Sequence, residues 1–412
     1  MVKFLLISVL IFVSACSTTA IDPGNPFGSC NTTDKEDYVV CKMAANLNVL
    51  VRNTQDDLFN ISRIDLTVYP ADNSTTTPPI ERFSMGALPK SARLGSVSVH
   101  HVELHRDFHL PRNERIPVVN LFDNNLTAFP TNITSRDDLF FILITNQKIR
   151  ALSPNSFTAI MANLNTLSLE DIQLEEIEPN TFTQLSNLNH LRLRKNYLNV
   201  LHSDMFTGLK HLQLLDLTNN QIRAIEPGTF ANISDTWWSL YLGGNQLKVI
   251  EPNTFTQVSK LHYLGLKSTQ LTTIEPNTFM ELSYLGVLDM EKNYLKVLSP
   301  HMFAGLDQLP ELRLGYNQIH TIEKGTFMQL SGLEYLDLER NNLTVLHLDM
   351  FAGLDRLENL RLEDNPIDTI NLGSSVSFSL LQKVFPDVDM LSVLSGFPKE
   401  LNERKVTYVT GN

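Results

Sequence analysis

Basic residues are in short supply in this chain of 412 residues. It holds 33 Lys and Arg against 45 Asp and Glu, which gives a formal net charge of −12. No run of Lys or Arg reverses that field locally. Because an acidic surface repels phosphate backbones, we do not expect a nucleic acid as a partner.

Long hydrophobic runs are also missing after the first twenty residues. Lys3 followed by the apolar stretch Phe4–Val13, which is too short to span a bilayer, predicts a signal peptide over residues 1–20 with cleavage after Ala20. The segment Val13–Cys16 also resembles a bacterial lipoprotein box, which stays open as an alternative. No later segment predicts a membrane span, and the last 42 residues lack the tail of a glycolipid anchor. We expect a secreted, soluble mature chain.

Cysteine occurs only three times. Removal of the signal peptide would leave Cys30 and Cys41, an even number in an oxidising compartment, and we expect them to form a disulfide bond. The alternative is two unrelated free thiols.

Catalytic signatures are lacking as well. The sequence contains no G-x-S-x-G, no H-E-x-x-H and no phosphate-binding glycine loop. Four histidines occur close together, at positions 100, 101, 105 and 109, and could suggest a metal site. The repeat described below places the first two at the end of a strand. We therefore do not expect the four side chains to converge on one ion. We therefore predict no enzyme activity, no metal site and no cofactor.

What the sequence does contain is an internal repeat. From Leu188, Leu212 and Leu285 the chain follows one frame, L-x-x-L-x-L-x-x-N-x-L-x-x-I-x-x-x-x-F-x-x-L, in steps of 24 or 25 residues. Ile172 and Thr269 replace the Asn of two units. The Asn column contains Asn196, Asn220, Asn245, Asn293, Asn317, Asn341 and Asn365, and extends backwards through Gln147, Asn124 and Val102.

Each column of the repeat has a physical reason. Alternation along a strand turns both leucines of L-x-L inward, as at Leu191 and Leu193, and the residue between them outward. The Asn should satisfy backbone groups in the turn after each strand, and the Phe column, such as Phe206 and Phe230, should fill the core. The repeats are of two kinds: one contains an EPNTF-like segment and the other a DMF-like segment before the chain turns back. The two kinds partly alternate, which suggests duplication in pairs of about 48 residues.

This frame resembles the leucine-rich repeat of extracellular animal proteins, such as the ectodomains of Toll-like receptors and Slit. The resemblance implies an α/β solenoid: a curved horseshoe with a parallel β-sheet on its concave face and short helical or irregular segments on its convex face. It also implies an N-terminal cap with a disulfide over 21–60, a solenoid of about 12–13 repeats over 61–370 whose first repeats are irregular, and a C-terminal cap or tail over 371–412. That tail could also mediate oligomer formation.

In such solenoids ligands bind most often on the concave face. Asp289, Arg313, Asp337 and Arg361 occupy central strand positions there, and should form either a self-paired charge ladder or an electrostatic docking strip. In the middle of the face, aromatic and aliphatic residues predict an exposed ligand-binding cluster. The alternative is that the tryptophans only fill space around a 25-residue repeat. The predicted ligand-binding residues are Trp238, Tyr241, His262, Tyr263, Leu214 and Val287.

Seven Asn-x-Ser/Thr sequons behind a signal peptide predict N-glycosylation. We therefore expect a secreted glycoprotein that binds a protein or glycoconjugate partner, in the manner of the arthropod secreted leucine-rich-repeat immune proteins that it resembles, although it lacks their C-terminal cysteine pair and coiled coil. The alternative is a structural component of the extracellular matrix or of cell adhesion. The sequons are Asn31, Asn60, Asn73, Asn125, Asn132, Asn232 and Asn342.

Overall fold

A computed structural model describes most of the repeat region and parts of both ends. The described residues are 5–9, 27–32, 38–43, 47–56, 61–70, 80–85, 92–101, 104–109, 116–131, 139–157, 163–231, 233, 238–371, 383–385 and 407–408. Those before 96, those at 105–109, residue 370 and those after 371 are described by their backbone alone. The chain divides into two compact units, Met1–Asn196 and Tyr197–Asn412.

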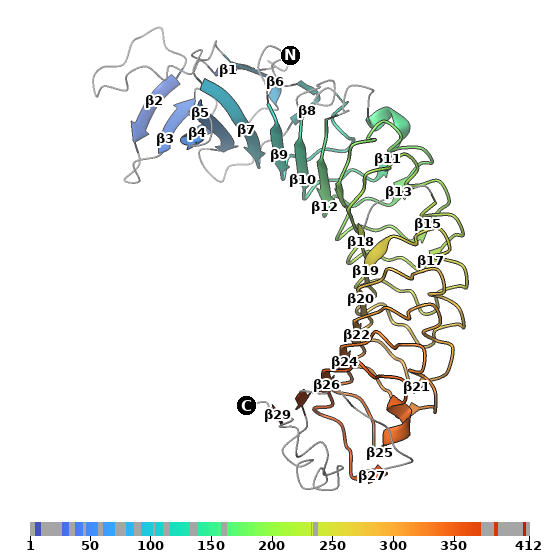
Figure 1. Cartoon of the computed structure of the whole chain (residues 1–412). Coiled ribbons are helices and arrows are strands. Elements are labelled where there is room, and N and C mark those ends of the chain that lie inside the picture. The colour runs from blue at the N-terminus through green and yellow to red at the C-terminus, as the bar shows by residue number, and fades with distance from the viewer. Residues whose placement is uncertain are drawn as a thin grey trace. The chain divides into compact units, whose positions relative to one another are not determined.

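The first unit begins with an antiparallel meander and continues as a parallel sheet (Figure 1). The strands β2 (Phe27–Thr32), β3 (Tyr38–Met43), β4 (Leu47–Asp56) and β5 (Ile61–Pro70) pair antiparallel in that order. From β5 onward every pairing in this sheet is parallel, through β7 (Ala92–His100), β9 (Val118–Phe122), β10 (Phe141–Thr145), β12 (Thr166–Glu170) and β14 (His190–Arg192). A separate parallel sheet joins β1 (Leu5–Val9), β6 (Ile80–Met85) and β8 (Leu104–His109). Cleavage after Ala20 would remove β1.

The second unit is a stack of short parallel strands. They are β16 (Leu214–Asp216), β18 (Trp238–Tyr241), β19 (Leu261–Gly265), β20 (Val287–Asp289), β22 (Glu311–Arg313), β24 (Tyr335–Asp337) and β26 (Asn359–Arg361). The pairing continues through β28 (Lys383–Phe385) and β29 (Thr407–Tyr408). Because Leu360, Val384 and Tyr408 are 24 residues apart and in register, the strand spacing of the repeat extends into the tail.

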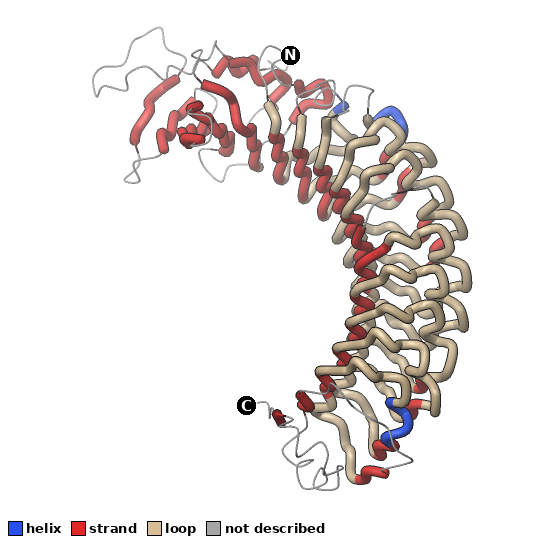
Figure 2. The backbone as a smooth tube through the Cα atoms, in the orientation of Figure 1, coloured by secondary structure: helices blue, strands red, loops and turns tan. Residues whose placement is uncertain are grey.

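Two-stranded ladders lie on the return side of the coils, away from the main sheets. In the first unit the ladder is β11 (Ala151–Leu152) with β13 (Glu176–Ile177). In the second unit the ladders are β15 (Val200–Leu201) with β17 (Ala224–Ile225), β21 (Val297–Leu298) with β23 (Thr321–Ile322), and β25 (Val345–His347) with β27 (Thr369–Asn371). The return segments are otherwise irregular, with short 3-10 helices at η2 (Pro154–Ser156) and η3 (Leu348–Phe351) (Figure 2). The predicted solenoid with a parallel sheet is thus confirmed, and its described return segments are mostly irregular with two short 3-10 helices.

The core consists of the repeated Leu and Phe columns. Phe206, Phe230, Phe255 and Phe279 are all buried, and each ring lies 6.2 to 6.3 Å from the next, centroid to centroid. A single repeat cannot cover its own apolar face, so each buried ring, at about 1.5–3 kcal/mol, stabilises its neighbours as well as its own unit. The predicted Phe column is confirmed as core.

Buried asparagines link successive turns through the backbone. The Asn293 Oδ1 accepts from the backbone N–H of Thr269 and of Leu271, at 3.0 Å each, while its Nδ2 donates to the carbonyls of Leu266 (2.8 Å) and Met290 (3.0 Å). Asn196 repeats all four bonds. At Asn317, Asn341 and Asn365 the Oδ1 accepts from one backbone N–H of the preceding turn, and the Nδ2 donates to carbonyls of both turns.

Other side chains take the Asn role where the column departs from Asn. The Gln147 Oε1 accepts from the N–H of Asn124 and of Leu126, at 3.2 and 2.9 Å. The Thr269 hydroxyl donates to the Leu266 carbonyl at 2.8 Å and so replaces one of the missing amide bonds. The Asn ladder that the sequence predicts is therefore present, and Thr269 preserves part of it.

Candidate protein-binding face

In the sheet of the second unit, alternate side chains of each strand point away from the core. Burial alternates along the strands, as in β16, where Leu215 is buried and its neighbours Leu214 and Asp216 are partly exposed. We call the outward-pointing positions of β16 to β26, together with the outward position two residues after each strand, the sheet face. These positions sit on short hydrogen-bonded strands, which hold their backbones rigidly.

Two tyrosines form an aromatic platform on this face. The Tyr241 and Tyr263 rings stack at 4.7 Å between centroids with 29° between their planes. They lie close over Gly265, where an added β-carbon would come within 3.0 Å of Tyr263 Cε1 and 3.6 Å of Tyr241 Cδ1. Leu214 and Val287 are partly exposed on the strands to either side. Four of the six predicted ligand-binding residues thus form one partly exposed patch.

His262 lies at the surface beside a strand irregularity. Trp238 and Ser239 on β18 face Leu261 and Tyr263 on β19, so His262 is the extra residue between them. Its side chain is exposed and lies over Gly286, where a β-carbon would come within 2.2 Å of His262 Cε1. The imidazole therefore lies beside the platform and depends on a neighbour without a side chain.

The prediction that Trp238 is exposed is wrong. Its side chain is 1% exposed, and its ring packs 6.3 Å from that of Phe230. Strand alternation explains the error: Leu240 points inward, so Trp238, two residues earlier, points inward too. The alternative interpretation, that tryptophan fills space inside a 25-residue repeat, holds for Trp238. Its Nε1 is buried with no hydrogen-bond partner.

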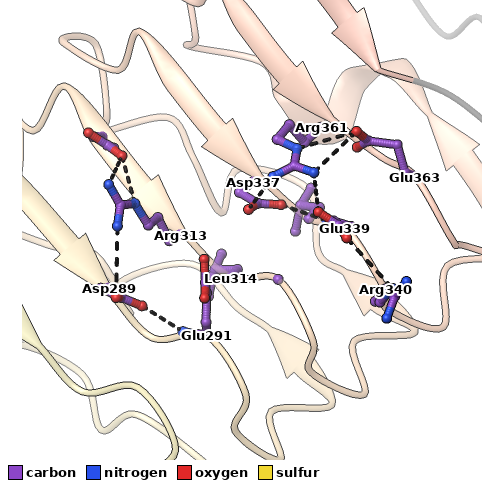
Figure 3. A network of polar contacts seen from close by, with 12 residues as sticks. Asp289, Glu291, Arg313, Leu314, Asp337, Glu339, Arg340, Arg361 and Glu363 are labelled. Atoms are coloured by element: carbon purple, nitrogen blue, oxygen red, sulfur yellow. Dashed lines mark hydrogen bonds and ion pairs between the residues drawn. The ribbon is translucent and has the colours of Figure 1, made fainter. Parts of the chain in front are cut away.

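Toward the C-terminal end of the unit the sheet face becomes a network of carboxylates around a few cations (Figure 3). Arg313 contacts Glu311 at 2.6 Å and Asp289 at 3.9 Å. Arg361 contacts Asp337 at 3.6 Å and Glu363 at 3.3 Å, and also pairs with Glu339; Lys267 pairs with Glu291. The expected pairs Asp289–Arg313 and Asp337–Arg361 are present, so the ladder is at least partly self-paired.

Burial changes the titration of this network. Desolvation raises the pKa of the Asp289, Asp337 and Glu363 carboxyls above their ordinary values, since a buried carboxylate loses hydration. Burial also raises the pKa of Tyr263, and the nearby Asp289 charge adds to that shift. The Tyr263 hydroxyl, 3.4 Å from Asp289 Oδ2, therefore stays protonated and connects the aromatic platform to the carboxylates.

The four histidines at 100, 101, 105 and 109 belong to the first unit. His100 stacks on Phe122 at 4.3 Å and His101 pairs with Asp123 at 3.1 Å, while the side chains of His105 and His109 are outside the described residues. Within the described part of the chain, no group of three metal-binding side chains is found. Over the same part, no helix is long and apolar enough to cross a membrane.

Cysteines and sequons are placed only in part. The register of β2 and β3 makes Cys30 and Cys41 direct Cα partners, although their side chains are not described. Asn125 and Asn342 are exposed on turns, as glycan attachment requires. Asn31 lies in β2, described by backbone alone. Outside the described residues lie Asn60, Asn73, Asn132 and Asn232.

Two features escaped the sequence analysis. The Thr of the EPNTF-like segments has a structural role: the Thr229 hydroxyl donates to the Glu226 carbonyl at 2.7 Å and lies 2.9 Å from the Leu201 carbonyl of the preceding turn. Its recurrence at a fixed place before Phe was the available signal. The second feature is Tyr316, whose ring centroid lies 5.2 Å from the Lys292 Nζ and 4.9 Å from the Arg340 Cζ.

The leucine-rich repeat family model matches residues 142–198, 186–238, 239–293, 259–319 and 307–367, which together cover 142–367, more than half of the chain. The chain therefore belongs to the leucine-rich repeat family. A search of curated protein sequences finds no match.

Among solved structures, chains of receptor ectodomain complexes have similar folds. A chain of the Drosophila Toll–Spatzle complex matches with TM-score 0.64 at 18% identity, over 90% of this chain and 56% of that one. The TLR13–ssRNA13 complex gives 0.58 at 21%, over 76% and 51%. A complex of Latrophilin 3, Unc5D and FLRT2 gives 0.52 at 22%, over 73% and 82%. The chain thus spans roughly half to three-fifths of the Toll and TLR13 chains, and the likeness establishes a fold resembling Toll-like receptor ectodomains.

Proposed function

We propose that this chain is a secreted leucine-rich-repeat glycoprotein that binds a protein or glycoconjugate partner through its sheet face, in innate immune recognition. The observation that carries the proposal is the patch of Leu214, Tyr241, Tyr263 and Val287, which is partly exposed on a rigid sheet. Tyrosines bury a large area at a low entropy cost, which suits them to the centre of an interface. A binding role also agrees with the sequence, in which we find no motif that pairs a nucleophile with a base.

An extracellular location has independent support. The apolar leader, the sequons and the two exposed asparagines Asn125 and Asn342 all fit the secretory route. The Toll–Spatzle structure is described as a hub of development and innate immunity in Drosophila, which supports an immune role by likeness of fold alone.

The second candidate function is adhesion or matrix structure. The similarity to the octameric complex of Latrophilin 3, Unc5D and FLRT2 favours it, because a structural role requires assembly with other proteins and the alignment covers 82% of the matched chain. An adhesive partner could use the same sheet face, so the two candidates differ in the partner and not in the site.

Site-specific photo-crosslinking tests the sheet face directly. A photoreactive residue at Ser239, between Leu214 and Tyr263 in strand register, should give a defined adduct in native extracellular fluid. The matched control carries the photoreactive residue at exposed Gln257, in the return segment. We expect the adduct only from position 239, and its loss in a Tyr241→Ala variant. Equal adducts from both positions would contradict the proposal.

The identity of the crosslinked species separates the two candidates. A microbial or immune-cascade protein recovered after microbial challenge supports immune recognition. A matrix or cell-surface protein recovered without challenge supports adhesion.

A further inference from the structure

The sheet face of the second unit is unevenly charged. It carries seven carboxylates but only three cations, Lys267, Arg313 and Arg361, within β16 to β26 and the residues two positions after them. A self-neutralised ladder would need equal numbers. The carboxylates are those of Asp216, Asp289, Glu291, Glu311, Asp337, Glu339 and Glu363.

The three cations are already shared among the carboxylates. Arg361 serves Asp337, Glu339 and Glu363, and Arg340 adds a contact of 3.6 Å to Glu339, so these three acids share two positive charges. The Glu363 Oε2 is buried without a hydrogen-bond partner. This arrangement leaves a net negative field over the strands that follow the aromatic platform, and a cationic ligand would neutralise it.

The aromatic platform lies at the beginning of this negative strip. Tyr263 carries a partly exposed ring and a hydroxyl 3.4 Å from the Asp289 carboxylate, so a ring face and a negative charge lie together. A guanidinium can stack on a tyrosine ring and pair with a carboxylate at the same time. The chain itself uses such stacking nearby, where Arg340 lies over the Tyr316 ring at 4.9 Å.

We propose that the partner presents a positively charged protein segment to this sheet face, with apolar side chains and arginines resting on the Tyr241–Tyr263 platform and further cations beside the partly exposed carboxylates of Glu291, Glu311 and Glu363. This inference rests on the proposed function and specifies the chemistry of the partner. The same negative field disfavours a nucleic acid on this surface.

Synthetic peptides test the charge requirement on the full chain. The probe alternates arginine with leucine, and its matched control replaces each arginine with citrulline, which keeps the shape and removes the charge. By isothermal titration, we expect the arginine peptide to bind at least about tenfold more tightly at about 0.05 M salt, with the advantage shrinking toward about 0.3 M as screening increases.

Carboxylate variants locate the binding site. The pair Glu311→Gln and Glu363→Gln should weaken binding of the arginine peptide by about threefold to tenfold. The control pair Glu251→Gln and Glu323→Gln removes the same charge from the return side and should leave binding within about twofold. Because Gln keeps the size of Glu, circular dichroism should show all four changes to be tolerated.

Each remaining outcome has a definite meaning. Equal affinity for the arginine and citrulline peptides, or an equal effect of both variant pairs, would overturn the charge inference. Absence of binding of the arginine peptide would overturn it as well. None of these results removes the proposed function, which fails only if photo-crosslinking at Ser239 gives no adduct beyond that at Gln257.

Discussion

Gly305 lies so close to the backbone of Met280 in the preceding repeat that a β-carbon on it would come within 2.3 Å of the Met280 carbonyl oxygen. A β-carbon on Gly353 would likewise come within 2.7 Å of the Met328 Cα. The glycine of the DMF-like unit therefore packs against the return segment of the EPNTF-like unit before it. The alternation of repeat kinds, which suggested duplication, also has a packing reason.

This close approach predicts a large effect of one methyl group. Gly305 has a φ of +89°, and Gly305→Ala adds both backbone strain and a clash with backbone atoms, so we expect a loss of about 2 kcal/mol or more in the free energy of unfolding. The control is Gly286→Ala, whose nearest contact is the movable end of His262, with an expected loss of about 0.5 kcal/mol. Urea denaturation measures both, and equal losses would contradict the packing argument.

The opposite environments of Trp238 and Tyr241 give the second prediction. Trp238→Ala should empty a buried site and lower the free energy of unfolding by about 3–5 kcal/mol. Tyr241→Ala removes a partly exposed ring and should cost about 1 kcal/mol or less. Thermal unfolding followed by circular dichroism compares the two, and a Trp238→Ala variant as stable as the unmodified chain would place that ring at the surface.

The Asn ladder predicts a polar rather than an apolar contribution to stability. In Asn293→Ala the buried N–H groups of Thr269 and Leu271 lose their partner, at about 1–3 kcal/mol for each group left unpaired, while the Leu266 carbonyl keeps the Thr269 hydroxyl. We expect a total loss of about 3 kcal/mol in urea denaturation. Asn359→Ala, at a partly exposed position of β26, is the control and should change stability by less than about 0.5 kcal/mol.

Sequence periodicity predicted the features that every repeat must share. The Leu and Phe columns and the Asn bonds follow from the fixed spacing, because each turn repeats the same backbone geometry. Trp238 was misplaced because it lies at an irregularity, where the count from the repeat frame and the count from strand alternation differ by one residue. The stacking of Tyr241 on Tyr263 and the sharing of Arg361 among three acids depend on side-chain conformations that spacing does not encode.

The proposed disulfide gives a prediction for the N-terminal unit. Since Cys30 and Cys41 are Cα partners in an antiparallel pair, a bond between them needs no change of register. We expect alkylation of both thiols only after reduction, and a loss of about 3 kcal/mol in stability on reduction. Mass spectrometry of the alkylated protein measures the first, and alkylation of both cysteines without a reductant would show two free thiols.

The buried carboxyl of Asp337 predicts how stability should change with pH. Burial raises its pKa in the folded chain above the unfolded value, so the folded state holds this proton more tightly. The stability that this proton contributes is fully present below the ordinary aspartate pKa of about 3.9 and is lost as the pH rises through the folded pKa. Asp337→Asn removes that loss, while its amide oxygen can still accept from the Glu339 N–H, as the Asp337 Oδ1 does at 2.8 Å. We therefore expect the stability of the variant, relative to the unmodified chain, to increase from about pH 4 toward neutrality. Urea denaturation across that range measures the difference, and a difference that falls with rising pH would mean that pairing with Arg361 outweighs burial at this carboxyl.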